Sequence, residues 1–242
     1  MEIQIFDTEE EVIESYAKFI VEKAKEALKE RGRFTLVLSG GNSPKRVYEL
    51  LATEKYNSAI NWSQVDFFFG DERYVPFESE RNNARMALNS LLRPLELAAE
   101  RIHIINTTLP VEEAARDYFS QIEGYFSNEK PVFDLVLLGL GSNAHTASLF
   151  PHTTVLHAKN PDVKPVFLKD EQVWRITLTA PLINAAHDVA FLTFGEDKSR
   201  AVWQIIKGEK DTESFPAQLI KPTSGTLHWF LDQEAASLIQ AK

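Results

Sequence analysis

One short segment constrains the fold of this chain more than any other. Residues 135–138 are an unbroken apolar run that ends in a polar loop containing Gly139, Gly141 and His145. An apolar run without polar alternation indicates a strand covered on both faces, as in a parallel sheet, and ligands bind beyond the carboxyl ends of such strands. The segment therefore predicts a buried strand that presents His145 at a binding edge. By itself it is equally compatible with a turn in which the histidine makes only a local hydrogen bond.

A second apolar run, residues 34–38, leads into a loop of serine, glycine and asparagine at residues 39–43. Two glycines let backbone amides converge there, and Ser43 and Pro44 are suited to cap and begin a helix whose positive end faces the loop. Such a corner binds phosphate well, although an ordinary strand-to-helix turn can have the same sequence. The loop has neither the Walker lysine nor the dinucleotide glycine spacing, so no nucleotide cofactor is predicted.

A third apolar run, residues 65–69, is followed after Gly70 by Asp71, Glu72 and Arg73. Three ionisable side chains directly after a buried strand must each find water, a partner or a ligand. Arg73 is suited to bind a carboxylate or to stabilise an oxyanion. It is equally suited to a structural ion pair with one of the two neighbouring carboxylates.

Strands and helices alternate along the rest of the chain. Thr8 and Glu11 form a capping-box pattern before a long helix that ends near Gly32. We expect further strands at residues 101–105, 173–178, 189–194 and 226–231, and further helices at residues 82–92, 110–126, up to 206 and from 233 onwards. This alternation predicts an α/β fold with a parallel sheet and right-handed crossovers. No linker or repeat interrupts residues 1–242, so we expect one domain.

Composition limits the partners of the chain. Its 26 Lys and Arg residues stand against 35 Asp and Glu residues, a formal charge of -9, which argues against a nucleic-acid or anionic-membrane surface. The chain has no cysteine, no secretory-signal pattern at its start, and no apolar stretch near the roughly 20 residues that span a bilayer. We therefore expect a cytoplasmic protein that binds a small molecule at a local site.

Two cations lie near expected strand ends in the second half of the chain. Arg175 belongs to the expected strand at residues 173–178, and Lys198 lies in the first turn of a helix, where the dipole disfavours positive charge. Lys198 is therefore a candidate anion ligand, although an exposed lysine is the ordinary explanation. His152 and His157 lack the spacing of a metal site, so we expect no metal.

Four segments resemble the 6-phosphogluconolactonase family in their order and approximate spacing: LSGGNSP from Leu38, FFFGDERYVP from Phe67, GLGSNAHTASLFP from Gly139 and RITLTAPLINAAHDVAFLTFGEDKSRAV from Arg175. The resemblance covers nearly the whole chain. It implies a Rossmann-like parallel sheet with helices on both faces and a small additional subdomain. It also implies hydrolysis of 6-phosphogluconolactone to 6-phosphogluconate, a step of the oxidative pentose phosphate pathway, with no cofactor.

The same resemblance implies roles for individual residues. The substrate phosphate would be bound by Ser39, Gly40, Gly41, Asn42 and Ser43, with charge from Arg175 and Lys198. The catalytic residues would be His145, Arg73 and Asp71, with Glu72, Asn143 and Thr146 lining the site. His145 would act as general base on water and then as acid, a role suited to an unperturbed pKa of about 6.5. The partner would be a sugar phosphate lactone, and the protein a monomer or small homo-oligomer.

One position departs from the family pattern. The family usually has aspartate and glycine before the histidine, whereas this chain has Asn143 and Ala144. If that glycine takes a positive φ, alanine costs on the order of 1 kcal/mol. Asparagine accepts a hydrogen bond but has no charge with which to raise the basicity of His145. We therefore expect the chain to be active, at a rate equal to or below that of a protein with the family's aspartate.

Two alternatives remain open. A glucosamine-6-phosphate deaminase shares the phosphate corner, but that family continues after its histidine with a phenylalanine, asparagine and glutamate pattern that residues 146–151 lack. The other alternative is a sugar-phosphate binder with weak or no catalysis. It is disfavoured because both His145 and Arg73 are present.

Overall fold

The computed structural model describes residues 1–127 and 129–240 of the chain. Its centre is a six-stranded sheet in the order β1-β9-β8-β5-β2-β3, in which neighbouring strands are parallel. The strands are β1 (Glu2–Phe6), β2 (Phe34–Leu38), β3 (Val65–Phe69), β5 (Leu135–Gly139), β8 (Asp188–Thr193) and β9 (Thr226–Asp232). The expected parallel α/β sheet is confirmed. The three strands that end in polar loops, β5, β2 and β3, are neighbours in it.

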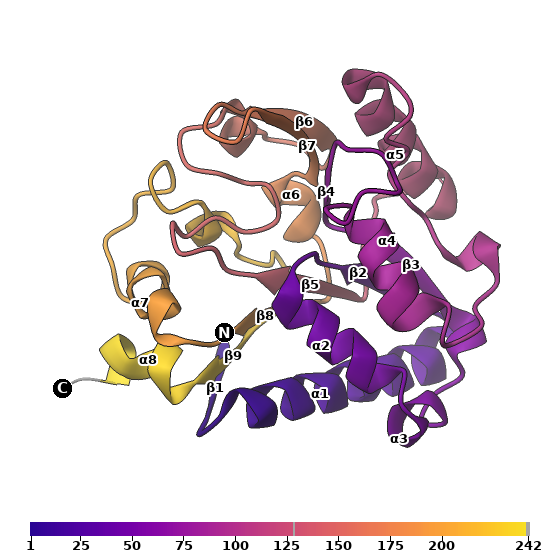
Figure 1. The fold of residues 1–242 in the computed structure, drawn as a ribbon, viewed down its shortest axis with the longest axis horizontal. Helices are drawn as coiled ribbons and strands as arrows, with labels where there is room; N and C mark the ends of the chain where they lie inside the picture. The colour runs from indigo at the N-terminus through magenta and orange to yellow at the C-terminus, as the bar shows by residue number, and fades with distance from the viewer. Residues whose placement is uncertain (128, 241–242) are drawn as a thin grey trace.

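Helices cover both faces of this sheet (Figure 1). One face carries α1 (Glu9–Arg31), α2 (Asn42–Leu51), α3 (Glu54–Asn57) and α4 (Asn83–Ala87), and the other carries α5 (Val111–Tyr125), α6 (Ala180–Ile183), α7 (Ser199–Ile206) and α8 (Gln233–Gln240). Alternate residues of β5 serve the two sides, since Leu135 and Leu137 pack in one core and Val136 and Leu138 in the other. Both faces of the strand are thus shielded from water, which explains its unbroken apolar sequence.

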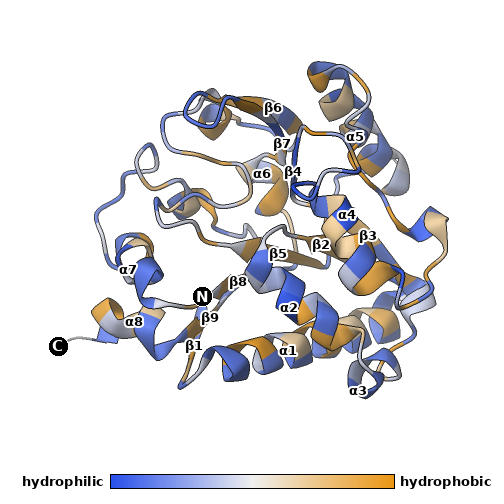
Figure 2. Cartoon of the chain, in the orientation of Figure 1, coloured by the Kyte–Doolittle hydropathy of each residue, from blue (hydrophilic) through white to orange (hydrophobic). Residues whose placement is uncertain are grey.

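Shorter helical turns complete the helical part of the chain. They are the 3-10 turns Trp62–Gln64, Ala99–Arg101, Thr154–His157, Glu196–Lys198 and Pro216–Leu219, and a π-helical turn, Leu88–Leu92, that extends α4. Figure 2 shows that the central strands are apolar, whereas α1 and α2 carry both hydrophilic and hydrophobic residues. No helix in the described part of the chain is long and apolar enough to cross a membrane.

A second, antiparallel sheet lies beside the carboxyl ends of the parallel strands (Figure 1). Its strands are β4 (Asp71–Arg73), β7 (Val173–Leu178) and β6 (Val163–Leu168), in the order β4-β7-β6. This sheet is the small addition that the family resemblance implied. Only Gly70 separates β3 from β4, so the chain passes directly from the parallel sheet into the small one.

Several element predictions need correction. Residues 101–105 do not form a strand: Ile102 makes a single parallel bridge to Phe67, and the His103 N–H donates to the same residue. Residues 71–73 and 163–168, for which no strand was predicted, form β4 and β6. Short segments rich in charge or containing Pro165 carry little strand signal, and pairing with β7 is what orders them.

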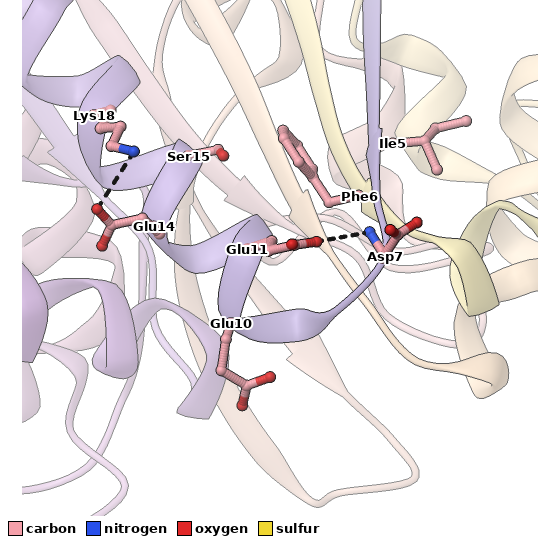
Figure 3. Close-up of a pocket in the computed structure, with 8 residues that line it drawn as sticks. All are labelled: Ile5, Phe6, Asp7, Glu10, Glu11, Glu14, Ser15 and Lys18. Carbon is pink, nitrogen blue, oxygen red and sulfur yellow. Dashed lines mark hydrogen bonds and ion pairs between the residues drawn. The ribbon is translucent and has the colours of Figure 1, made fainter.

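The two N-terminal helices begin in different ways. The capping box of α1 is confirmed: the Thr8 hydroxyl accepts from the Glu11 N–H, and the Glu11 carboxylate accepts from the Thr8 N–H. The same carboxylate also accepts from the Asp7 N–H (Figure 3). The prediction that Ser43 caps α2 is wrong. Gly41, with φ of 105°, is the cap residue, and no side chain in the described part of the chain caps this helix. The first-turn amides of α2 are thus left without a side-chain acceptor.

Candidate active site

The loops after β2, β5 and β8 meet the small sheet around a cavity of about 240 Å³. Most of the predicted site residues line it: Ser39, Gly40, Gly41, Asn42, Ser43, Asp71, Arg73, His145, Arg175 and Lys198. Glu72, Asn143 and Thr146 do not belong to the lining. His145 and the loop at residues 39–43 therefore border one space, although about a hundred residues of sequence separate them.

A larger groove of about 660 Å³ lies elsewhere, between β1 and α1 (Figure 3). Carboxylates of Asp7, Glu10, Glu11 and Glu14 line it, and the one cation, Lys18, pairs with Glu14. Such a groove repels anions. The cavity at the strand ends is instead lined by three cationic side chains and a histidine: Arg73, Arg175, Lys198 and His145. It is therefore the better place for a phosphorylated ligand.

Buried tyrosines hold the backbone at two of the strand ends. The Tyr48 hydroxyl accepts from the Ser39 N–H and donates to the Ser39 carbonyl, both at 2.9 Å. The Tyr118 hydroxyl makes the same pair of bonds with Phe69, at 2.7 and 3.2 Å. Because its amide is engaged within the protein, Ser39 can offer a ligand only its hydroxyl, which narrows the predicted role of this residue.

The small sheet brings two arginines together. Arg73 of β4 and Arg175 of β7 are direct cross-strand partners, and like charges in that position are destabilising unless other groups compensate. Arg73 Nη1 donates to the Asn83 Oδ1 at 2.6 Å and to the Arg81 carbonyl at 3.0 Å. Arg175 is only 8% exposed, and its Nε has no hydrogen-bond partner among the described residues. A buried guanidinium with a free N–H at a cavity is suited to bind an anion.

Asn83 is a lining residue that the sequence reasoning missed. Its Nδ2 donates to the Asp71 carbonyl at 3.0 Å, while its Oδ1 accepts from Arg73. A Cβ on Gly40 would come within 2.0 Å of Asn83 Oδ1, so only glycine allows the 39–43 loop to approach so closely. Asn83 thus joins the small sheet to the loop. The residues around Asn83 are mostly polar, as in an exposed segment, so the sequence did not indicate this contact.

Glu72 has a structural position behind the cavity. Its carboxylate accepts from the backbone N–H groups of Arg73, Asn83 and Ala84, at 2.8 to 2.9 Å. It thereby fixes the start of α4, and with it the side chain of Asn83. Burial raises the pKa of Glu72 to about 7, although the three N–H donors oppose that shift. The prediction that Glu72 lines the site is therefore wrong: Glu72 affects the cavity only indirectly, through α4 and Asn83.

Asn143 determines which nitrogen of His145 carries the proton. Its Oδ1 accepts from the His145 backbone N–H at 3.3 Å and lies 2.5 Å from His145 Nδ1. Since an amide oxygen only accepts, Nδ1 carries the proton and Nε2 keeps a free lone pair. Burial is the main cause that lowers the pKa of His145 to about 4. The imidazole is neutral at pH 7, as expected, but less basic than an unperturbed histidine.

Two hydrogen bonds fix the conformation of the loop that carries His145. The Gly141 N–H donates to the His145 carbonyl at 2.9 Å, and the Thr146 hydroxyl donates to the Gly139 carbonyl at 2.8 Å. Ala144 has φ of 61°, so alanine does occupy a left-handed position that favours glycine. The strained turn is the means by which the chain reverses direction before His145.

Phe150 connects the histidine to one arginine. Its ring stacks on the imidazole of His145, with centroids 3.9 Å apart and planes at 15°, and the Arg175 guanidinium lies 5.5 Å from the same ring. Stacking of this kind restricts the plane of the imidazole. Nothing in the spacing of the apolar residues distinguished Phe150 from an ordinary core residue.

Asp71 and Lys198 complete the charged lining. The buried hydroxyl of Ser148 donates to Asp71 Oδ2 at 2.6 Å, which orients the carboxylate. Lys198 is the residue before α7, and its Nζ pairs with the exposed Asp197 at 2.9 Å. Among the described residues, no group of three His, Asp or Glu side chains is placed to hold a metal ion.

Comparison with known proteins gives the class to which this fold and cavity belong. The family model of glucosamine-6-phosphate isomerases and 6-phosphogluconolactonases matches residues 7–229. The chain belongs to this family. It is 38% identical over 238 residues to a 6-phosphogluconolactonase of Synechocystis, covering 97% of this chain and 96% of that protein.

Two further relatives extend the comparison. The bovine 6-phosphogluconolactonase is 36% identical over 241 residues, covering 98% of this chain and 93% of that protein. The structure of 6-phosphogluconolactonase from Trypanosoma cruzi superposes with a TM-score of 0.89 at 28% identity, covering 99% and 97% of the two chains. The family membership expected from the four sequence segments is confirmed.

Proposed function

We propose that this protein is a 6-phosphogluconolactonase, which hydrolyses 6-phospho-D-glucono-1,5-lactone to 6-phosphogluconate within the oxidative pentose phosphate pathway. The observation that carries the proposal is the shared cavity: a neutral histidine and a glycine loop at a helix start line the same space as an arginine with a free, buried N–H. The names of its full-length relatives support the same reaction.

The phosphate would lie at the 39–43 loop. The helix dipole and the first-turn amides of α2 favour an anion there, and Arg175 and Lys198 add charge-assisted hydrogen bonds. Because the phosphate does not change during hydrolysis, these groups would bind substrate and transition state about equally. Their contribution is therefore to substrate affinity.

The lactone ring would lie toward His145 and Arg73. Nε2 of His145 takes a proton from water as the oxygen adds to the lactone carbonyl, and Arg73 stabilises the oxyanion that forms. Collapse of this tetrahedral intermediate breaks the bond between C1 and the ring oxygen. The imidazolium returns its proton to that oxygen, and the new carboxylic acid ionises. Asp71, oriented by Ser148, favours the imidazolium through its negative charge.

The test is lactone hydrolysis measured above the spontaneous background. We expect rapid hydrolysis of 6-phosphogluconolactone and much slower hydrolysis of the unphosphorylated lactone, since the latter cannot use the phosphate contacts. Equal rates for the two lactones would contradict the proposal.

A second candidate function is a sugar-phosphate binder with weak catalysis. Two observations favour it: Asn143 supplies no charge next to the imidazole, and the pKa of His145 is about 4. Calorimetric binding of 6-phosphogluconate without turnover of the lactone would identify this function. Turnover clearly above background excludes it.

A further inference from the structure

Glu171 contacts the cavity indirectly, through an arginine. It lies in the turn between β6 and β7, and its Oε2 accepts from Arg175 Nη2 at 2.7 Å. The same carboxylate lies 3.6 Å from Arg81 Nη2. Glu171 itself is not a lining residue, whereas Arg175 is. A carboxylate from outside the cavity therefore engages a cation that belongs to the cavity wall.

The charges around Glu171 keep it ionised. Partial burial opposes ionisation, but the hydrogen bond from Arg175 and the charges of Arg175, Arg81 and Arg73 hold the pKa of Glu171 below its ordinary value. One carboxylate thus stands among three guanidinium groups. Positive charge remains in excess at this corner, which suits the arrival of a second anion.

The contact with Glu171 uses only one of the hydrogen-bond donors on one edge of the Arg175 guanidinium. Nε and Nη2 form one edge of a guanidinium, and such an edge binds carboxylates and phosphates through two parallel hydrogen bonds. Glu171 takes Nη2, while Nε is buried without a partner among the described residues. The side chain of Glu171 is 39% exposed, so it can turn into water without burying its charge.

We infer that Glu171 is an internal counter-ion of Arg175, exchanged for the phosphate of the ligand when that ligand binds. The inference rests on the proposed function, because it takes Arg175 to be a phosphate ligand. A phosphate on the Nε and Nη2 edge satisfies both N–H groups, whereas Glu171 satisfies one. Glu171 therefore sets the affinity of the site for anions by competing with them.

The experiment is titration calorimetry with inorganic phosphate at constant ionic strength, comparing the wild type with three variants. Glu171→Gln removes the competing charge and keeps the size of the side chain. Asp170→Asn removes the same charge from the neighbouring residue of the same turn and serves as the matched control. Arg175→Ala removes the proposed ligand.

We expect Glu171→Gln to lower the Kd for phosphate by roughly twofold to fivefold, because the carboxylate is partly exposed and its charge is screened by water. Asp170→Asn should change the Kd less than twofold, and Arg175→Ala should raise it at least about tenfold. If Glu171→Gln binds phosphate like Asp170→Asn, or more weakly than the wild type, the counter-ion inference is wrong while the phosphate site stands. If Arg175→Ala binds phosphate like the wild type, the phosphate assignment of Arg175 fails as well.

Discussion

The two sheets of this protein supply different chemistry to one cavity. The parallel sheet contributes loops whose backbone is fixed close to the strand ends, as in the 39–43 loop and the turn before His145. The small antiparallel sheet contributes three charged side chains, Asp71, Arg73 and Arg175. Hydrogen bonds with Ser148, Asn83 and Glu171, respectively, hold them in place. The difference shows that one sheet gives the site its shape and the imidazole of His145, and the other gives it most of its charge.

The largest effect is expected at the parallel-sheet loop that carries the proposed base. His145→Ala should lower kcat for 6-phosphogluconolactone by roughly 100- to 10,000-fold, because general-base assistance is lost. His157→Ala, at a side chain 64% exposed and outside the cavity lining, is the control and should retain full activity. Undiminished kcat in His145→Ala would remove the residue from the mechanism.

A smaller effect, of another kind, is expected in the small sheet. Arg175→Ala should raise KM by roughly 10- to 100-fold and leave kcat nearly unchanged, since its proposed ligand, the phosphate, does not react. The comparison variant is Arg93→Ala, which removes an exposed arginine far from these strands in the sequence. A fall in kcat at unchanged KM would place Arg175 at the reacting end of the substrate.

The contact between the two regions can be broken at Gly40. In Gly40→Ala the new Cβ meets Asn83, which must release Arg73 or Asp71 to make room. We expect a loss of about 1–3 kcal/mol in the free energy of unfolding, together with reduced activity. Gly124→Ala, where a Cβ meets nothing within 4 Å, is the matched control. Equal unfolding midpoints in urea for both variants would contradict this contact.

The two regions also respond to pH with opposite sign. The pKa of His145 is lowered from 6.5 to about 4, so the native state binds fewer protons than the unfolded state in that window, and stability rises with pH. The pKa of Glu72 is raised from 4.5 to about 7, so its contribution falls as pH rises between those values. The two contributions offset each other in the wild type.

Single variants should separate these contributions. Relative to the wild type, His145→Gln should lose stability as pH rises from 4.5 to 6.5, and Glu72→Gln should gain it, by up to about 1.4 kcal/mol per pH unit. Urea unfolding at a series of pH values measures both slopes. Parallel pH profiles for the three proteins would show that neither group titrates as its surroundings indicate.

The smallest effect is expected where the chain departs from its family. Asn143→Asp places a charge beside His145 Nδ1, which favours the imidazolium and raises the pKa of His145 from about 4. We expect a severalfold rise in kcat and a shift of the acid limb of the rate profile to higher pH. An unchanged rate and profile would show that the carboxylate is dispensable here.

Local sequence patterns were sufficient to predict the parallel sheet, but only the central strand, β7, of the small one. Strands such as β2, β3 and β5 are buried on both faces, so each has an apolar run that identifies it without knowledge of its neighbours. The strands β4 and β6 have no such run. They form because each pairs with β7. A local sequence pattern does not show which strands will pair.

The same distinction holds within the candidate site. The 39–43 loop, Arg73 and His145 were predicted because each follows an apolar run, and they do line the cavity. Asn83, Ser148 and Phe150 were missed because their importance lies in contacts with residues far along the chain or in ring geometry. The lowered pKa of His145 also depends on burial, which only the folded chain reveals.

The tyrosine hydroxyls that close the ends of β2 and β3 have a consequence for recognition. Each hydroxyl satisfies a backbone amide and a carbonyl that would otherwise need water or a ligand as hydrogen-bond partner. The backbone at these strand ends can therefore keep its conformation when a ligand binds. When the backbone around a site is already rigid, binding does not have to order a loop, and the entropic cost of binding is smaller. The amide hydrogens of Ser39 and Phe69 should consequently exchange with solvent as slowly as those of the central strands.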